Sequence, residues 1–261
     1  MWSHRPSFTI TLQCASRLIN VRDKLRRRIP ARPAEASNVA ATRHSIPSGN
    51  SVLDAIYVEP IAQPARASVL ICHGIGELAP QWFPIQRILA DSGVASLVFD
   101  YSGYGRSTGH IDWSQLELDA ISAFQLLERL APPGPISLLG FSLGTGIVPA
   151  IVSRVNADRL VLCAGYTSLR AAARAIGLPK FLSPLVPPIW NAQESLPNCL
   201  LPVLVVHSTK DWLFPVQMAH DLVNWCGGNA QLLLMPGLGH NEPFYKPQLS
   251  YWGPISSFLL S

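Results

Sequence analysis

Residues 135–146 read Pro-Ile-Ser-Leu-Leu-Gly-Phe-Ser-Leu-Gly-Thr-Gly, an apolar run of strand length that breaks into glycines around one serine. The pentapeptide 140–144 has the G-x-S-x-G spacing of a sharp turn between a strand and a helix. Glycines two residues before and after the serine remove side chains that would collide with neighbouring backbone. Such a turn aims the Ser142 hydroxyl at a helix N-terminus, where N–H groups stabilise negative charge. The alternative for the pentapeptide alone is an ordinary glycine-rich turn.

Strand-length apolar runs alternate with helix-length periodic segments around this turn. Several runs are apolar at consecutive positions, which is typical of strands buried on both faces of a parallel sheet. The alternation predicts an α/β fold with a mostly parallel sheet, helices on both faces, and functional groups at the carboxyl ends of the strands. The predicted strands are 53–58, 67–72, 95–99, 136–140, 159–163, 202–206 and 230–235, and the predicted helices are 82–92, 113–130, 144–156, 168–176, 216–226 and 248–260.

Length and composition favour one large globular domain. The chain has 261 residues, of which 48% are hydrophobic and 14% are charged, and this suits a well-buried core. No run reaches the roughly 18 apolar residues that span a bilayer. The five cysteines show no C-x-x-C spacing, which indicates a reducing compartment and neither a disulfide scaffold nor a cysteine metal site. We therefore expect a cytoplasmic protein.

The basic charge lies at the start of the chain. Residues 1–44 contain nine Lys or Arg and two Asp or Glu, whereas residues 45–261 contain eleven and fourteen. We expect a catalytic domain over 45–261 after a basic extension, with a linker rich in Pro, Ala and Ser over 30–50. Apolar residues recur at helical spacing over 18–29, so peripheral membrane contact through the extension is one hypothesis. A solvated or loosely docked helix is the alternative. The body shows no basic face that indicates nucleic-acid binding.

Two further residues fall where a reactive serine would need them. A serine hydroxyl is a weak nucleophile near neutral pH, so it requires an adjacent base that a third group orients. Asp211 follows the predicted strand 202–206, and His240 follows the predicted strand 230–235. Both loops open on the same sheet edge as Ser142. We therefore predict Ser142, His240 and Asp211 as a catalytic triad; a turn residue and a structural histidine are the alternatives for Asp211 and His240.

A triad of this kind needs an oxyanion hole. Two backbone N–H groups must face the developing alkoxide, and losing one typically costs roughly 3 kcal/mol of transition-state stabilisation. Leu143, directly after the serine, is predicted to supply one donor. The loop 73–77, which reads H-G-I-G-E, follows the predicted strand 67–72. Its glycines allow close approach of the backbone to a substrate, and we predict the Ile75 N–H as the second donor.

Three apolar side chains close to these residues are predicted to bind an acyl chain, with core packing as the alternative for each: Phe141, Trp212 and Phe214.

The glycine-rich stretch 103–109 is similar to a dinucleotide-binding motif. Its spacing is G-x-G-x-x-x-G, however, and no helix is expected directly after it, so we predict a structural turn. No group of His and carboxylates has metal-ligand spacing. We predict neither a metal nor a cofactor.

Taken together, these motifs resemble the α/β-hydrolase superfamily over about residues 50–261. The order Ser, Asp, His along the chain is the order of that superfamily, and the loops 73–77 and 99–107 resemble the branch of monoacylglycerol lipases and serine-aminopeptidase-like hydrolases. The resemblance implies an α/β-hydrolase fold and a serine hydrolase that cleaves small carboxylic esters, or thioesters, through an acyl-enzyme. The chain departs from this branch at Phe141, where its lipases often carry histidine. It departs also in the short insert 166–201, which leaves room for a small flap only.

A peptidase or amidase of the same fold is an alternative interpretation of these motifs. A non-catalytic ligand-binding protein that keeps the pocket is another.

Overall fold

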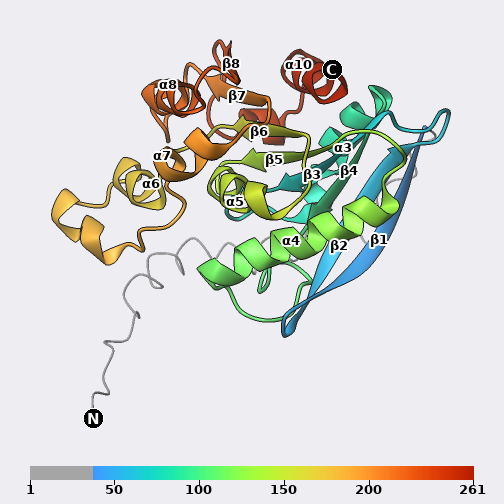
Figure 1. Ribbon diagram of the computed structural model, residues 1–261, viewed down its shortest axis with the longest axis horizontal. Helices are drawn as coiled ribbons and strands as arrows, with labels where there is room; N and C mark the ends of the chain where they lie inside the picture. Colours follow the sequence, from blue (N-terminus) through green and yellow to red (C-terminus); the bar gives the residue numbers. More distant parts are fainter. Residues whose placement is uncertain (1–37) are drawn as a thin grey trace.

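The computed structural model describes residues 38–261, which form an eight-stranded sheet flanked by helices (Figure 1). The strand order is β1-β2-β4-β3-β5-β6-β7-β8. β2 pairs antiparallel with β1 and β4, and all other neighbours pair parallel. This confirms the predicted α/β fold with a mostly parallel sheet. The strands are β1 (Val39–Ser48), β2 (Ser51–Pro60), β3 (Ala67–Cys72), β4 (Val94–Phe99), β5 (Ile136–Phe141), β6 (Arg159–Cys163), β7 (Val203–Ser208) and β8 (Ala230–Met235).

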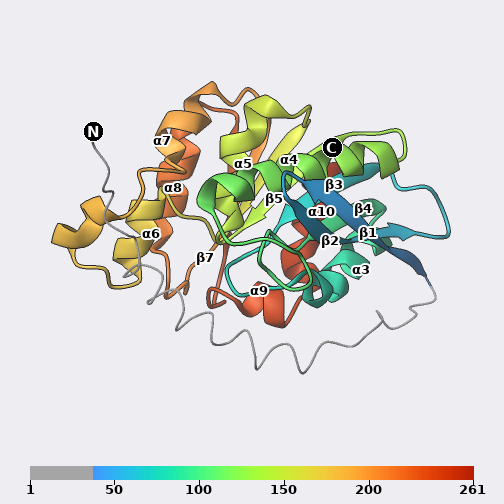
Figure 2. The ribbon, with the colours of Figure 1, turned by 90° about the horizontal axis from the view of Figure 1, so that it is seen from below.

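The helices divide between the two faces of the sheet. In Figure 2 the strands lie between α4 and α5 on one side and α3 and α10 on the other. The bounds of α3, α4, α6, α8 and α10 agree with the predicted segments to within one residue at each end, whereas the α-helix predicted over 144–156 ends at Ile151. The helical elements are η2 (Ala79–Trp82), α3 (Phe83–Asp91), α4 (Trp113–Leu130), α5 (Gly144–Ile151), η3 (Val152–Arg154), α6 (Leu169–Ala175), η4 (Lys180–Leu185), α7 (Ala192–Ser195), η5 (Leu196–Asn198), α8 (Val216–Trp225), α9 (Glu242–Tyr245) and α10 (Leu249–Leu260).

The sheet separates two hydrophobic cores. All six side chains of β3 are buried, because each face of the strand is covered by helices. Successive side chains point to opposite faces of a strand, so Leu70 lies in the core with Leu116 of α4, and Ile71 lies in the other core with Trp252 of α10. This double burial explains why the central strands read as continuous apolar runs.

β1 corrects one expectation from the sequence. The predicted linker over 30–50 is wrong for Val39–Ser48, which pairs with β2 along its whole length. An edge strand presents one side to solvent, and most side chains of β1 are exposed or half-buried. It therefore lacks the apolar run that marks the central strands. The rest of the extension lies outside the described residues, so the hypothesis of membrane contact through residues 1–44 stays a prediction.

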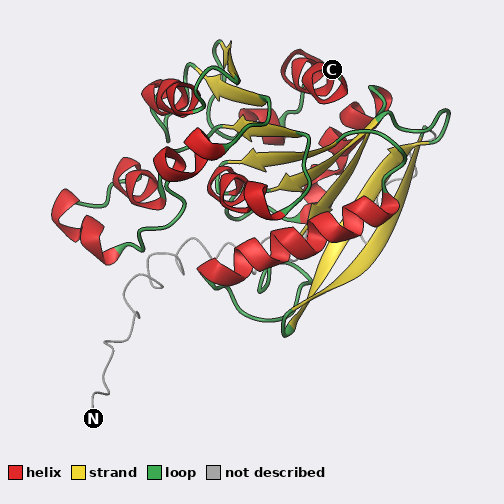
Figure 3. Cartoon of the chain, in the orientation of Figure 1, coloured by secondary structure: helices red, strands yellow, loops and turns green. Residues whose placement is uncertain are grey.

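The insert between β6 and β7 forms only short helices and loops. It contains α6, η4, α7 and η5, and Figure 1 shows α6 on the side toward which the arrows of β5 and β6 point. Figure 3 shows the same region as a chain of short helices joined by loops. Among the helices of residues 38–261, none is long and apolar enough to cross a membrane.

Asp119 of α4 joins distant parts of the fold through a buried carboxylate. It accepts hydrogen bonds from Ser48 Oγ at 2.7 Å and from the Ser102 N–H at 2.7 Å. Gln115 Nε2 donates to the same carboxylate at 2.8 Å. Ser48 ends β1, and Ser102 lies in the loop after β4. One side chain therefore connects the edge strand, a loop and a helix.

We predict that Asp119→Ala lowers the free energy of unfolding by about 3 kcal/mol, because it leaves buried donors without an acceptor. Urea denaturation monitored by circular dichroism measures the change. Glu128→Ala, at an exposed site on the same helix, is the matched control and should change stability by no more than about 0.5 kcal/mol. Equal stabilities of the two variants would contradict this role for Asp119.

Candidate active site

The turn after β5 holds Ser142 in an unusual backbone conformation. Its φ of +49° lies in the left-handed region, which is uncommon for residues other than glycine and indicates local strain. The neighbouring glycines are sterically required. A Cβ at Gly144 would collide with the carbonyl oxygen of Cys72, and a Cβ at Gly140 would collide with the Gly144 carbonyl. The structure thus has the sharp strand-to-helix turn that the sequence predicts.

The structure brings together the three side chains predicted as a triad. His240 Nε2 lies 2.9 Å from Ser142 Oγ, and His240 Nδ1 lies 2.7 Å from Asp211 Oδ2. Ser142 follows β5, Asp211 follows β7 and His240 follows β8, so all three lie beyond the carboxyl ends of these strands. Ser142 is 5% exposed and His240 is 2% exposed. A continuous hydrogen-bonded chain therefore runs from a carboxylate to a hydroxyl in a nearly closed site.

The Asp211 carboxylate is oriented by its own loop. Its Oδ1 accepts the N–H groups of Leu213 and Phe214, both at 2.8 Å, which leaves Oδ2 for His240. Burial raises the pKa of Asp211, but the hydrogen bond from His240 and these two N–H groups outweigh burial and hold the pKa below its ordinary value. The carboxylate is therefore ionised at neutral pH.

His207 of β7 contacts the loop that carries Asp211. Its ring is fully buried, and its Nε2 lies 3.0 Å from the carbonyl oxygen of Phe214 and 3.7 Å from Asp211 Oδ2. Burial lowers the pKa of His207 below its ordinary value, against the opposing effects of Phe214 and Asp211. A neutral His207 that donates to the Phe214 carbonyl fixes the turn that carries Asp211.

The two predicted oxyanion donors lie at the same edge of the sheet. Leu143 is the N-cap residue of α5, and Ile75 lies in the loop after β3. β3 and β5 are adjacent, with Cys72 opposite Gly140, so the two segments leave the sheet side by side. Within residues 38–261, neither N–H donates a hydrogen bond to another protein group. Both remain free for an acceptor from a substrate.

Two buried carboxyl groups behind this loop have contacts that the sequence did not indicate. Glu77 Oε2 accepts the Gly74 N–H at 2.8 Å and Trp82 Nε1–H at 3.1 Å. Asp100 Oδ1 accepts the Ala79 N–H at 2.7 Å. Both residues belong to motifs recognised from the sequence. For Glu77 the signal available in the sequence was a carboxylate three residues after Gly74, but its partners depend on how the loop folds.

The three side chains predicted to bind substrate differ in their surroundings. Phe141 is fully buried in the core, with its ring 5.6 Å from that of Trp82. Phe214 packs edge-on against His240 with ring centroids 5.1 Å apart. Trp212 is 74% exposed and lies beside Gly239, next to the histidine. Binding roles for all three stay predictions, and the surroundings of Phe141 are those of a packing residue.

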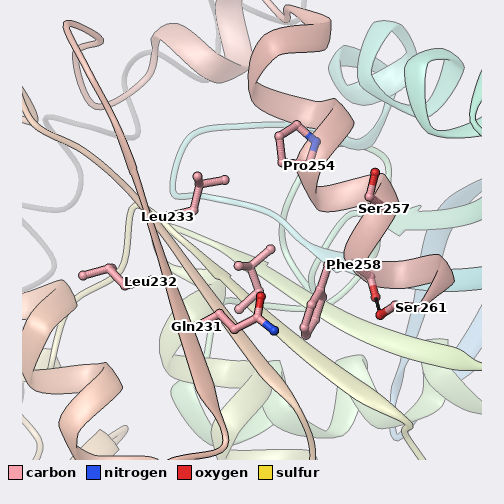
Figure 4. Close-up of a pocket in the computed structure, with 8 residues that line it drawn as sticks. Gln231, Leu232, Leu233, Pro254, Ser257, Phe258 and Ser261 are labelled. Carbon is pink, nitrogen blue, oxygen red and sulfur yellow. Dashed lines mark hydrogen bonds between the residues drawn. The ribbon is translucent and has the colours of Figure 1, made fainter.

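A groove of about 420 Å³ lies away from this site, between β8 and α10 (Figure 4). Figure 4 shows Leu233 of β8 facing Phe258 and Pro254 of α10 across it. None of the three triad residues lines the groove.

No group of three His, Cys, Asp or Glu side chains in the described part of the chain is arranged to hold a metal ion.

Residues 63–200, more than half of the chain, match the family model described as serine aminopeptidase, S33 (Hydrolase_4). The chain belongs to this family. The resemblance to α/β-hydrolases is thereby confirmed. The matched region contains Ser142 and the loop 73–77, and it ends before Asp211 and His240.

Sequence relatives include a lipase. Lysophosphatidylserine lipase ABHD12 of Danio rerio is 26% identical over 214 residues, which cover 73% of this chain and 56% of that protein. An uncharacterized protein of Mycobacterium tuberculosis is 28% identical over 179 residues, covering 67% of this chain and 63% of its own length. The chain thus spans less than two thirds of either relative.

A solved structure confirms the fold. Esterase Pf2001 of Pyrococcus furiosus superposes with a TM-score of 0.71 at 19% identity, covering 88% of this chain and 95% of that chain. The sequence relatives thus include a lipase at distant identity, and the solved structure that shares the fold is an esterase.

Proposed function

We propose that this protein is a serine hydrolase that cleaves carboxylic esters or thioesters, with Ser142 as the nucleophile. The observation that carries the proposal is the hydrogen-bonded chain from Asp211 through His240 to Ser142. Membership of a family with esterase and lipase relatives supports the same reaction class. A small-molecule acyl ester is the proposed substrate.

The hydrogen bonds assign the proton positions on His240. Asp211 is ionised, so it can only accept, and His240 Nδ1 must carry the proton of that contact. In the neutral imidazole that a general base requires, Nε2 is then unprotonated and accepts the hydroxyl proton of Ser142. This is the tautomer that a general base needs. As Ser142 attacks the carbonyl, the proton passes to Nε2, and the Asp211 carboxylate stabilises the imidazolium that forms.

The tetrahedral intermediate requires donors for its oxyanion. The N–H groups of Leu143 and Ile75 would supply them, with the N-terminus of α5 adding a favourable dipole. Collapse of the intermediate releases the alcohol, which takes the proton from His240 and leaves an acyl group on Ser142. Water, activated by the same histidine, then hydrolyses the acyl-enzyme.

Exposed apolar side chains in two of the loops at this sheet edge favour an acyl chain as part of the substrate. Ile75, in the loop after β3, is 47% exposed, and Trp212, beside Gly239, is 74% exposed. Such groups gain stability when a hydrocarbon chain covers them. The family description as serine aminopeptidase supports amide cleavage as a second candidate function.

A fluorophosphonate probe should label the wild-type protein and fail to label Ser142→Ala.

Asp211→Asn should lower the turnover of an ester by on the order of 10⁴-fold, because the histidine loses its orientation and tautomer. Ser137→Ala is the matched control, since Ser137 is buried on the same strand and its hydroxyl has no partner in the described chain. Equal labelling of wild type and Ser142→Ala would remove the basis of the proposal.

A substrate panel separates esterase from peptidase. We expect p-nitrophenyl esters to have kcat/KM values at least about 100-fold above those of aminoacyl p-nitroanilides. Trp212→Ala should raise KM for the decanoate ester several-fold and leave that for the acetate ester unchanged, because only the long chain reaches the indole. Leu200→Ala, at a residue 85% exposed before β7, is the control. Faster cleavage of the anilides would instead favour the aminopeptidase.

A further inference from the structure

Glu77 is a buried carboxyl group that takes no part in the reaction steps described above. It lies at the end of the loop 73–77 and is almost fully buried. No Lys or Arg among residues 38–261 forms an ion pair with it. Its partners are the Gly74 N–H and the Trp82 indole N–H. Burying a carboxyl group without a cation is costly, so its presence here calls for a reason.

The carboxyl group fills the inside of the loop that carries Ile75. A Cβ on Gly74 would lie only 2.6 Å from Glu77 Oε1, so the side chain packs directly on the glycine backbone. The Glu77 N–H also donates to the Gly74 carbonyl at 3.3 Å. Gly74 and Glu77 are thus joined by main chain and side chain together. Ile75 and Gly76 form the tip of the resulting turn.

Trp82 connects this turn to the core. Its ring is fully buried and contacts the rings of Phe141 and Trp252, with centroids 5.6 and 5.9 Å away. Because Glu77 Oε2 accepts from both the indole and Gly74, the loop is fixed to a rigid cluster directly beside the elbow. Movement of the carboxyl group would release the tip of the turn.

We propose that Glu77 is a positioning residue that holds the Ile75 N–H in place as the second oxyanion donor. The proposal rests on the proposed hydrolase function. It relates two residues of the H-G-I-G-E sequence in physical terms: a Cβ at residue 74 would displace the Glu77 carboxyl group from its present position. An amide side chain of the same length retains the oxygen acceptor, whereas alanine removes it.

Kinetics of three variants test the role. Glu77→Ala should lower kcat about 100-fold, the typical cost of one oxyanion donor, with KM changed less than about twofold. Binding of a trifluoromethyl ketone, whose adduct with Ser142 carries the oxyanion, should weaken by about the same factor as kcat. Glu77→Gln should restore kcat to within about fivefold of wild type.

Gln86→Ala is the matched control for lost stability. Gln86 is fully buried on α3 and donates to the carbonyls of Ile56 and Ser96, both at 3.1 Å, and neither of these partners belongs to the loop 73–77. It should lower Tm and leave kcat and ketone affinity unchanged. If Glu77→Ala does not fold, Trp82→Phe removes the indole N–H donor while keeping an aromatic ring in the core, and a three- to tenfold loss of kcat is expected.

The pH profile gives an independent readout. Burial raises the pKa of Glu77 to about 8 from an ordinary value of 4.5, against the hydrogen bonds of Gly74 and Trp82. The contribution of neutral Glu77 to the free energy of unfolding is fully present below about pH 4.5 and is lost as the pH rises through about 8. The Tm of wild type minus the Tm of Glu77→Gln should therefore decrease as the pH rises from about 4.5 to above about 8.

Other groups near Glu77 also have shifted pKa values. Burial raises the pKa values of Tyr101 and Tyr104 well above their ordinary range. Behind the same loop, burial lowers the pKa of His73 to about 4 and raises that of Asp100 to about 7. Asp100 is present in both proteins, so comparison with Glu77→Gln removes its contribution.

The outcomes separate this proposal from the proposed function. A wild-type protein that neither cleaves esters nor binds the ketone overturns the hydrolase assignment and this inference with it. An active wild type whose Glu77→Ala variant keeps its kcat overturns the positioning role alone. A variant that loses kcat while keeping full ketone affinity does so as well, because the oxyanion donors would then be intact.

Discussion

The close packing of the elbow against β3 is the constraint on which the site depends. Gly144 begins α5 directly against the carbonyl group that ends β3, where a Cβ would not fit. The contact brings the N-terminus of α5 next to the loop after β3. The left-handed φ of Ser142 then places its hydroxyl within hydrogen-bond distance of His240. A single steric contact thus sets the serine, the helix N-terminus and the loop of Ile75 in one place.

Buried polar side chains fix the loops that leave this edge of the sheet. Asp211 holds the turn of Leu213 and Phe214, and His207 holds the Phe214 carbonyl from the other side. Glu77 closes the loop before η2. Loops tend to be mobile, and catalysis needs fixed geometry. Buried hydrogen bonds supply that rigidity, because a hydrogen bond is stronger where water is excluded.

Sequence reasoning succeeded where a local pattern has one structural meaning. Doubly covered strands produce apolar runs, and residues just after them share a sheet edge, so Ser142, Asp211 and His240 could be placed together. β1 was missed because most of its side chains are exposed or half-buried, so its sequence has no such run. Contacts of Glu77 depend on the fold of its loop and on Trp82, and no residue pattern encodes them. The apolar character of Phe141 does not distinguish a core position from a pocket, and only the packing shows that it is buried.

The central claim is that Ser142 carries the acyl group during turnover. Rapid-quench mass spectrometry with a p-nitrophenyl ester tests it most directly. We predict that protein quenched during turnover gains the mass of one acyl group, and that peptide mapping places this group on the peptide containing Ser142. An acyl group on another residue, or turnover without acyl-protein at any quench time while Ser142→Ala stays active, would contradict the account.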